Sequence, residues 1–392
     1  MYRVIKARQL FDGERFVPEN AVVIKDNKIV EVVHISKEEE AQWEDIIIYD
    51  GILVPGFINT HCHLELSYLH QQFESGGGMI HFLHQMFDKR HNFSQQQIQE
   101  AITNWDKQMY NDGIVAVGDI VNSTNTLHIK KNSAIEYINF IEIFGLKNNN
   151  AEALFNQYLE VYNSFRNSGL KANVVPHSPY SLSQELWSKY RNFKDGSSVS
   201  IGSFHFMESR VERQLWDSHS SELMDYFISK FRYTLKELEH LFKNKREYLH
   251  FYLQKNDWSL LVHNTYLQEK DLDALSTYQD KIFFCLCPNA NLFIENRLPN
   301  VLLIRSFTDK ICLGTDSLAS NYNLSIVDEM NVILKYFDVS TEDVLKWATS
   351  NGAAALGIQN KYGYIQKNYL ASLNLIEIKD KRITLIETVH QD

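Results

Sequence analysis

Short apolar runs alternate with longer amphipathic stretches through the middle of the chain. The stretches at 95–111 and 151–167 repeat their apolar positions with helical spacing. Apolar strands that alternate with helices are typical of a parallel α/β architecture, and eight such units predict a closed (β/α)8 TIM barrel. The candidate strands are 52–60, 113–121, 137–144, 171–177, 199–205, 259–263, 281–287 and 310–315.

The two ends of the chain carry a different pattern, in which short apolar runs are separated by tight turns. Residues 21–33, AVVIKDNKIVEVV, hold two β-branched runs around residues 26–28, which predicts a hairpin. The tail from residue 362 again reads as strands, with a turn at 379–381. We therefore expect β structure at both ends and the barrel between them. A long helical insert, 230–256, interrupts the barrel pattern.

Composition narrows the class of protein. The chain has 392 residues, a formal net charge of −10, 44% hydrophobic and 22% charged residues, which is an ordinary globular mixture. An acidic balance disfavours nucleic acid as a partner. No apolar run reaches the roughly 18 to 20 residues that span a bilayer, and the first residues lack the apolar core of a signal peptide. We expect a soluble, cytoplasmic protein that has no membrane partner, and a homodimer stays open.

The segment NTHCHLEL, residues 59–66, places two histidines one residue apart at the end of an apolar strand. Residues i and i+2 of a strand point to the same face, so His61 and His63 share one side and Cys62 points to the other. At the C-terminal end of a barrel strand both imidazoles would point inward, where barrel active sites form. An HxH pair alone is weak evidence for metal binding.

Other strand ends supply matching partners. His205 ends one apolar strand and is followed three residues later by Glu208; His263 ends the next strand, and Asp316 ends a later one. Imidazole nitrogens and a carboxylate suit a divalent ion such as zinc or iron, with an open position for water. Each residue alone could be a hydrogen-bonded polar group at a barrel rim. Four strands that end in this way favour a metal site.

The sequence resembles the amidohydrolase superfamily. The likeness is strongest to the branch with cytosine, guanine and methylthioadenosine deaminases and the triazine chlorohydrolases, with an aminodeoxyfutalosine deaminase-like member as one candidate. The motifs occur in the family's order along most of the chain. They are PGFINTHCHLE (55–65), HSPYSLS (177–183), HFMES (205–209), LVHN (261–264), CPNANLFIENRLPNV (287–301) and GTDSLASNYNLSIVDEM (314–330).

The resemblance implies a barrel over 55–357 and a small β-sandwich composed of 1–54 and 358–392. It implies one divalent metal ion per chain, zinc before iron, and catalytic roles for Glu208, His263 and Asp316. Glu208 resembles the acid that shuttles protons, and His263 the residue that orients the attacking water. His177 resembles a histidine that contacts substrate. The implied metal ligands are His61, His63, His205 and Asp316.

Two departures from the family pattern affect these expectations. Members with two metals bridge them through a modified lysine at the end of the fourth strand; here His177 takes that position, so we expect a single metal. Relatives that deaminate methylthioadenosine carry an acidic residue after the first strand that binds ribose. No glutamate stands in the matching place of MIHFLHQMFDKRHNF, where Arg90 and His91 lie instead, and Arg90 is a candidate substrate contact.

These residues would catalyse hydrolytic deamination of a small aminated heterocycle: a purine, a purine nucleoside or a pterin. A metal lowers the pKa of bound water toward neutrality, and Asp316 accepts the proton. Hydroxide attacks a ring carbon while Glu208 protonates the neighbouring ring nitrogen and then the departing amine, so ammonia is released. His263 stabilises the intermediate.

Two other functions stay open. The same residues could expel chloride or open a ring, as in chlorohydrolases and imidazolonepropionase, or the chain could be an inactive scaffold. Ammonia release separates the first alternative from deamination. The substrate is expected to depend on loops, among them Gly76–Gly78 and the 230–256 insert, which could each cap the pocket.

Overall fold

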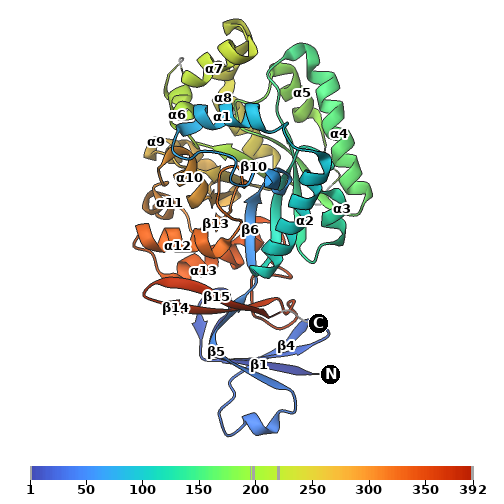
Figure 1. Cartoon of the computed structure of the whole chain (residues 1–392). Helices are drawn as coiled ribbons and strands as arrows, with labels where there is room; N and C mark the ends of the chain where they lie inside the picture. Colours follow the sequence, from blue (N-terminus) through green and yellow to red (C-terminus); the bar gives the residue numbers. More distant parts are fainter. Residues whose placement is uncertain (1, 195, 197–198, 219–220, 390–392) are drawn as a thin grey trace.

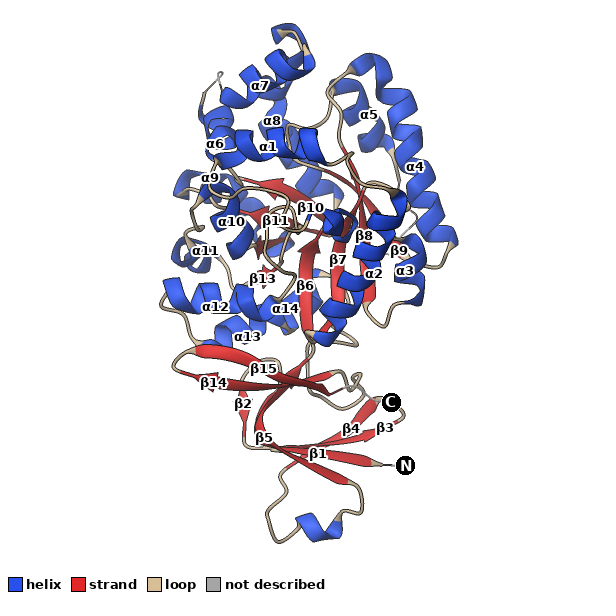
Figure 2. Ribbon diagram, viewed as in Figure 1, coloured by secondary structure: helices blue, strands red, loops and turns tan. Residues whose placement is uncertain are grey.

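The computed structural model describes residues 2–194, 196, 199–218 and 221–389. Residues 390–392, at the end of the predicted sandwich, and the side chains of 240–244, inside the predicted insert, lie outside this description. The chain forms a small part made of strands and a larger α/β part above it (Figure 1; Figure 2). Both described chain ends lie in the small part.

The small part is one sheet, here called the terminal sheet, to which both ends of the chain contribute. Its strand order is β15-β14-β5-β1-β3-β4, with β2 paired to β1. The predicted hairpin at 21–33 is confirmed: β3 and β4 are antiparallel, and Asp26 and Asn27 turn with φ of 49° and 61°. The strands are β1 (Arg3–Phe11), β2 (Phe16–Val17), β3 (Ala21–Lys25), β4 (Lys28–Val33), β5 (Ile46–Pro55), β14 (Leu373–Lys379) and β15 (Arg382–Val389).

The larger part contains two four-stranded parallel sheets, in the order β6-β7-β8-β9 and β10-β11-β12-β13. We call them the first and the second parallel sheet. Seven of the eight strands correspond to candidate runs, and β6 overlaps only the end of the run 52–60. The runs are apolar because parallel strands are buried on both faces. The strands are β6 (Phe57–Cys62), β7 (Ile114–Val121), β8 (Glu136–Ile143), β9 (Lys171–Pro176), β10 (Ile201–Phe206), β11 (Trp258–His263), β12 (Ile282–Leu286) and β13 (Ile311–Leu313).

The two parallel sheets are linked at both pairs of edges. Near the ends of β9 and β10, the His205 amide donates to the His177 carbonyl at 2.9 Å. At the other pair of edges, the Thr315 amide donates to the His61 carbonyl at 3.0 Å, and Cys62 and Asp316 form a parallel bridge. These bonds hold the C-terminal ends of the eight strands in one region.

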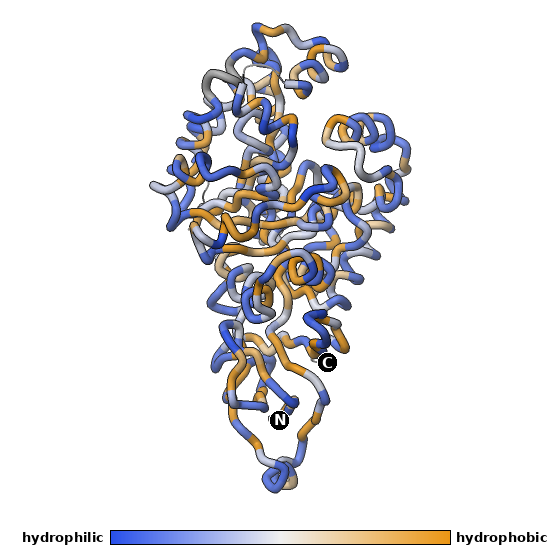
Figure 3. The backbone as a smooth tube through the Cα atoms, turned by 90° about the vertical axis from the view of Figure 1, so that its left-hand side faces the viewer, coloured by the Kyte–Doolittle hydropathy of each residue, from blue (hydrophilic) through white to orange (hydrophobic). Residues whose placement is uncertain are grey.

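Helices cover the outside of the two parallel sheets (Figure 2). Hydrophobic stretches run through the middle of the larger part, and hydrophilic positions dominate its outer helices (Figure 3). Two predicted helices, 95–111 and 151–167, form with those bounds. The helices are α1 (Gly78–Lys89), α2 (Gln95–Asn111), α3 (Leu127–Asn132), α4 (Ala151–Asn167), α5 (Gln184–Asn192), α6 (Arg210–Asp217), α7 (Glu222–Phe231), α8 (Leu235–Lys255), α9 (Glu269–Leu275), α10 (Pro288–Glu295), α11 (Val301–Phe307), α12 (Ile326–Tyr336), α13 (Thr341–Ala348) and α14 (Ser350–Ala355).

The predicted strand 52–60 is wrong as a single element, because it spans two sheets. β5 ends at Pro55 in the terminal sheet, and β6 begins at Phe57 in the first parallel sheet. The chain changes sheet at Gly56, whose amide donates to the Ser372 carbonyl at 2.8 Å. A Cβ at Gly56 would lie 2.4 Å from Val115 Cγ1, so the close approach requires glycine. The predicted domain boundaries stay predictions.

The predicted helical insert 230–256 is also corrected. α7 ends at Phe231, Arg232 turns with φ of 57°, and α8 begins only at Leu235 behind a Thr234 capping box. The Tyr252 hydroxyl accepts from the Ser203 amide at 2.9 Å and is buried against β10. α8 is therefore the helix that covers the outside of β10. Among the described residues, no helix has the length and apolar character to cross a membrane.

Candidate metal and acid–base site

The residues predicted to bind metal come together at the C-terminal ends of the strands. His61, on β6, and His63, directly after that strand, have 3.2 Å between their Nε2 atoms. The Asp316 Oδ1 atom lies 3.6 Å from His61 Nε2 and 3.3 Å from His63 Nε2. The His205 ring, from β10, has its centroid 5.0 Å from that of His61. All four side chains are buried.

Neighbouring groups orient the donor atoms. The Nδ1 atom of His205 lies 3.0 Å from the His177 carbonyl oxygen, so Nδ1–H donates and Nε2 faces the cluster. His263 likewise directs Nδ1 to Asn291 Oδ1 at 2.9 Å. The Ser320 hydroxyl donates to Asp316 Oδ2 at 2.5 Å, which leaves Oδ1 directed at the histidines. In His205, His263 and Asp316, one polar atom of the side chain is thus held by a hydrogen bond while the other faces the cluster.

The electrostatics of the cluster suit metal ligands. Burial lowers the pKa of His61, His63 and His205, so their rings are neutral and can offer lone pairs. Burial alone would raise the pKa of Asp316. The hydrogen bond to His61 and the neighbouring His63 and His263 outweigh that effect and lower its pKa. The cluster therefore offers neutral nitrogens and one carboxylate.

The donor set fits a divalent metal ion. Ligand atoms of His61, His205, His263 and Asp316 all lie within 4.8 Å of one another, and His63 contacts two of these residues. Among the described side chains, His263 Nε2 is buried without a hydrogen-bond partner. A buried polar atom is rarely left so, which favours an ion that this nitrogen could contact. Three or more imidazoles with a carboxylate suit zinc or iron.

Glu208 lies beside this cluster on a strained turn. Met207, the residue before it, has φ of 53°, and two cluster residues, His263 and Asp316, have φ of 75° and 59°. Such values cost energy in non-glycine residues and gather at functional sites. The buried Glu212 carboxylate holds the turn, because it accepts from the amides of Met207 at 2.8 Å and Glu208 at 2.7 Å.

The Glu208 side chain is placed and protonated as a general acid requires. Its Oε1 atom lies 3.5 Å from His263 Nε2. Burial, with the nearby Asp316 charge, raises the pKa of Glu208 to about 8. A carboxyl group with this pKa holds a proton at neutral pH and can donate it.

His177 joins the site through a residue that the sequence analysis missed. Its Nδ1 atom lies 2.8 Å from Oε1 of Glu142, a buried residue on β8. The same Oε1 lies 3.6 Å from His205 Nδ1. The available signal was a glutamate inside the apolar run YINFIEIFG, since a charged residue in a buried strand needs a partner.

The second predicted substrate contact, Arg90, is not brought to the cluster by any described hydrogen bond or ion pair. It ends α1, and its carbonyl accepts from the Tyr68 hydroxyl at 3.1 Å. Burial raises the pKa of Tyr158; the hydrogen bond to Phe144 and, least of the causes, the charge of Arg90 oppose that rise. The Tyr158 hydroxyl bonds to the Phe144 carbonyl at 3.2 Å, next to the His177 ring. Arg90 stays a predicted substrate contact.

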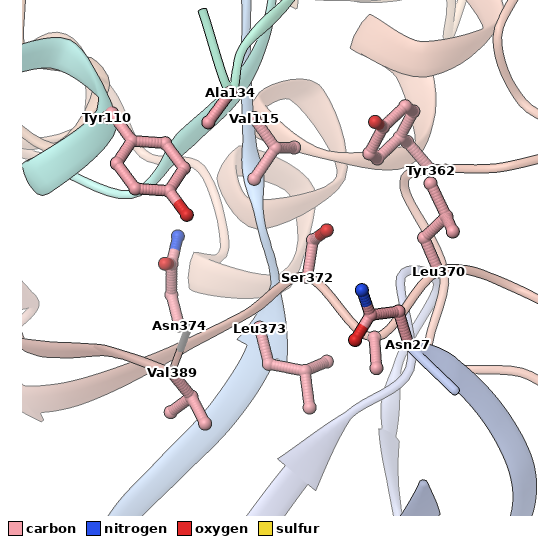
Figure 4. Close-up of a pocket in the computed structure, with 11 residues that line it drawn as sticks. Asn27, Tyr110, Val115, Ala134, Tyr362, Leu370, Ser372, Leu373, Asn374 and Val389 are labelled. Carbon is pink, nitrogen blue, oxygen red and sulfur yellow. The ribbon is translucent and has the colours of Figure 1, made fainter. Parts of the chain in front are cut away.

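A pocket at the opposite ends of the strands is separate from this site. Asn27, Val115, Tyr362, Asn374 and Val389 are among its lining residues, which come from the terminal sheet and from the base of the larger part (Figure 4). Val115 stands near the start of β7, whereas the histidine cluster stands at the strands' C-terminal ends. Chemistry in barrel-type folds occurs at the latter ends.

Comparison with known proteins agrees with this geometry. The model of the Amidohydrolase family matches residues 52–390. The chain therefore belongs to the Amidohydrolase family. Together with the histidine and aspartate cluster, membership of this metal-dependent family makes the protein a metal-dependent hydrolase, and its solved structural relatives give the larger part a TIM-barrel-type α/β fold.

Among relatives, an aminodeoxyfutalosine deaminase from Nitratiruptor sp. is 26% identical, over 96% of this chain and 92% of its own. The structure of Helicobacter pylori aminofutalosine deaminase in complex with methylthio-coformycin superposes with a TM-score of 0.79 at 23% identity, covering 97% and 93% of the two chains. An adenosine deaminase from Xanthomonas campestris with bound zinc superposes with a TM-score of 0.73 at 17% identity, covering 96% and 85%.

Proposed function

We propose that the protein is a metal-dependent deaminase that hydrolyses the exocyclic amine of an aminated purine or purine nucleoside. One observation carries this proposal: a buried glutamate that holds its proton at neutral pH lies 3.5 Å from a histidine of the metal-competent cluster. A site that only stores metal has no use for such a proton donor. Deaminases of purine-type compounds among the relatives support the substrate class.

His61, His63, His205 and Asp316 would hold the metal, as the convergence of their Nε2 and Oδ1 atoms supports. A divalent ion bound there supplies Lewis-acid activation of water near neutral pH. We propose zinc as the ion and one ion per chain; the zinc in a structural relative supports this choice. The donor set accepts iron as well.

The chain's own acid and base groups would move the protons. Glu208 donates its proton to a ring nitrogen of the substrate, which makes the adjacent carbon electrophilic. Asp316, which is ionised and directed inward, accepts a proton from the attacking water. Glu208 receives that proton and passes it to the departing amine, and the proton of the added hydroxyl returns to Glu208 as the carbonyl forms. His263, fixed by Asn291, directs the lone pair of Nε2 toward the reacting centre, where it would accept a hydrogen bond from the attacking water and orient it.

The substrate would lie against the exposed side of His177. That side chain is 39% exposed although its Nδ1 atom is bound to Glu142, so Nε2 is the atom available to a ligand. Phe144, 42% exposed, lies beside it, with ring centroids 6.4 Å apart. A flat heterocycle can contact both rings. Arg90 would contact the part of the substrate that lies farther from the metal.

The finer architecture also belongs to this proposal. The bonds at both pairs of sheet edges support a closed (β/α)8 barrel, and the shared terminal sheet supports a composite domain made from residues 1–54 and 358–392. The predicted second layer of a β-sandwich, the homodimer and the cytoplasmic location stay predictions.

The experiment is an assay of ammonia release by the metal-loaded protein across aminated purines, their nucleosides and pterins. Chlorinated triazines and imidazolone rings are tested in parallel for chloride release and ring opening. We expect ammonia from a purine or nucleoside and no chloride. Chloride or ring-opened product without ammonia would replace deamination with the alternative hydrolytic reactions of the same family.

A further inference from the structure

We propose that Glu142 is a positioning residue, which fixes the ring of His177 so that its Nε2 atom faces the substrate. This inference rests on the proposed substrate contact of His177. It concerns a residue that neither touches the substrate in the proposed arrangement nor belongs to the predicted metal ligands.

Glu142 is held on both carboxylate oxygens. Oε1 accepts the Nδ1–H of His177 at 2.8 Å, and Oε2 accepts from the Asn122 side-chain amide at 3.2 Å. The same Asn122 amide group donates to the Glu142 carbonyl oxygen at 3.1 Å, so side chain and backbone are fixed together. A carboxylate gripped in this way can hold an imidazole in one orientation.

The support continues to the first strand of the sheet. The backbone amides of Asn122 and Ser123 donate to Glu65 Oε2 at 3.1 and 3.0 Å. Glu65 follows β6, Asn122 follows β7, Glu142 is on β8 and His177 follows β9, so each bond joins neighbouring strand ends. The carboxylate of Glu65 anchors this row of contacts.

The ring of His177 also packs on the His205 ring, with centroids 4.4 Å apart, but this contact does not distinguish its two nitrogen atoms. Its side chain is 39% exposed, and its Nδ1 bond to Glu142 is the one described side-chain hydrogen bond that it makes. Rotation of the ring would exchange the atoms that face the substrate. The Glu142 bond specifies Nδ1–H on the inside and Nε2 on the outside.

The metal ligand His205 does not depend on Glu142 in the same way. Its Nδ1 atom is 3.6 Å from Glu142 Oε1, beyond a hydrogen bond, and donates instead to the backbone carbonyl of His177 at 3.0 Å. Loss of the Glu142 carboxylate should therefore disturb the substrate contact and leave metal binding in place.

A double-mutant cycle tests the inference. Glu142→Ala should reduce kcat/KM for ammonia release by about 10–100-fold, the usual effect of losing a residue that orients a functional histidine. In His177→Ala, adding Glu142→Ala should cause no further loss, because the two residues act as one unit. Glu142→Gln keeps an acceptor for Nδ1–H and should recover most of the activity. Glu136→Ala, at the other end of β8, is the matched control and should leave kcat/KM unchanged.

Additive losses in the cycle would overturn the inference. So would a fall in bound metal per chain in Glu142→Ala, which would make Glu142 a support for His205 instead. The inference is supported if Glu142→Ala keeps its bound metal and its melting temperature, loses activity in the wild-type background, and causes no further loss in the His177→Ala background.

A second readout does not require activity. In protein with nitrogen-labelled histidine rings, the signals of His177 are identified by their absence in His177→Ala. We expect a proton on Nδ1 in the wild type and its loss or transfer to Nε2 in Glu142→Ala. An unchanged Nδ1–H signal would overturn the positioning role. If the wild type released no ammonia from any compound, the proposed function would fail, and this signal would still decide the role of Glu142.

Discussion

Glu142, on the first parallel sheet, and Glu208, after the first strand of the second, are both buried beside the same histidine cluster, yet their pKa values move in opposite directions. Burial alone would raise both. For Glu142 the neighbouring His177 outweighs burial and lowers the pKa to about 2. For Glu208 burial dominates, and the nearby Asp316 charge adds to it, giving a pKa of about 8.

The contrast extends to the surrounding carboxyl groups. On β7 of the first sheet, Asp119 is buried in an ion pair with Lys130, which itself donates to Asn139 Oδ1 at 2.7 Å. On α6 and α12, burial raises the pKa of Glu212 and Glu329 to about 8. Among the described ion pairs, none joins these two glutamates to a lysine or arginine.

The difference shows how one fold separates fixed charge from available protons. On the first sheet the partnered Glu142 has a lowered pKa and orients its neighbours, whereas Glu208, after the first strand of the second sheet, has a raised pKa that favours holding a proton. Asp316 follows β13 of the second parallel sheet, yet its pKa is lowered. The cause is the hydrogen bond to His61 of the first sheet and the neighbouring His63 and His263. The proposed reaction uses both kinds of group.

The largest effect is expected from the cluster that both sheets share. His63→Ala removes a donor that lies 3.2 Å from His61 Nε2 and 3.3 Å from Asp316 Oδ1. We expect loss of stoichiometric metal and a fall of activity to the background rate, measured by metal analysis and ammonia release. His128→Asn, an exposed histidine on α3, is the control and should change neither. Full metal content in His63→Ala would remove it from the ligand set.

The next effect concerns the proton held on the second sheet. Glu208→Gln keeps the shape of the side chain but cannot deliver a proton, so kcat should fall by about 10²–10⁴-fold. KM and metal content should change little, because the substitution removes no predicted ligand. Glu222→Gln, in a surface pair with Arg210, is the matched control. A kcat within a few-fold of the wild type, with metal bound, would contradict the assigned role.

Stability tests the partnered charges of the first sheet. Asp119→Ala leaves the buried Lys130 without its partner, which should lower the free energy of unfolding by about 3–5 kcal/mol. Asp50→Ala breaks the ion pair between Asp50, whose side chain is 90% exposed, and Arg8, whose side chain is 57% exposed. It should lower the free energy of unfolding by about 0–1 kcal/mol. Denaturant unfolding measures both. Equal small losses would mean that the buried pair contributes little.

A pH dependence of stability is expected from a buried acid that no described ion pair joins to a lysine or arginine. The pKa of Glu329 is about 8 in the folded protein and near 4.5 when unfolded, so between these values the folded state binds more protons. Stability from this group is therefore complete below pH 4.5 and declines as the pH rises to 8, by about 1.4 kcal/mol per pH unit at most. Glu329→Gln should flatten the curve of unfolding free energy against pH over this window. A variant curve parallel to that of the wild type would show that Glu329 is ionised when folded.

The strands and the metal-competent residues could be predicted because their signals are local. Each strand of the two parallel sheets is a short apolar run, and His61, His63, His205 and Asp316 stand directly at the ends of such runs. Strand ends of a parallel α/β fold meet on one side, so the residues converge whatever the details of packing.

The remaining features depend on contacts between distant segments. The break at Gly56 lies inside a continuous apolar pattern and is set by contacts with Ser372 and Val115. Glu142 gains meaning only from the neighbour that strand pairing places beside it, His177. The position of Arg90 depends on where α1 ends, which its amphipathic pattern does not specify.

The most direct test of the proposed function is one turnover experiment in water enriched in heavy oxygen. Metal-loaded protein is mixed with an aminated purine nucleoside, and ammonia and labelled product are counted together. Hydrolytic deamination predicts one ammonia and one heavy oxygen atom per product molecule, with both lost in Glu208→Gln. Product that lacks the label, or no ammonia from fully metal-loaded protein across the purine series, would contradict the account.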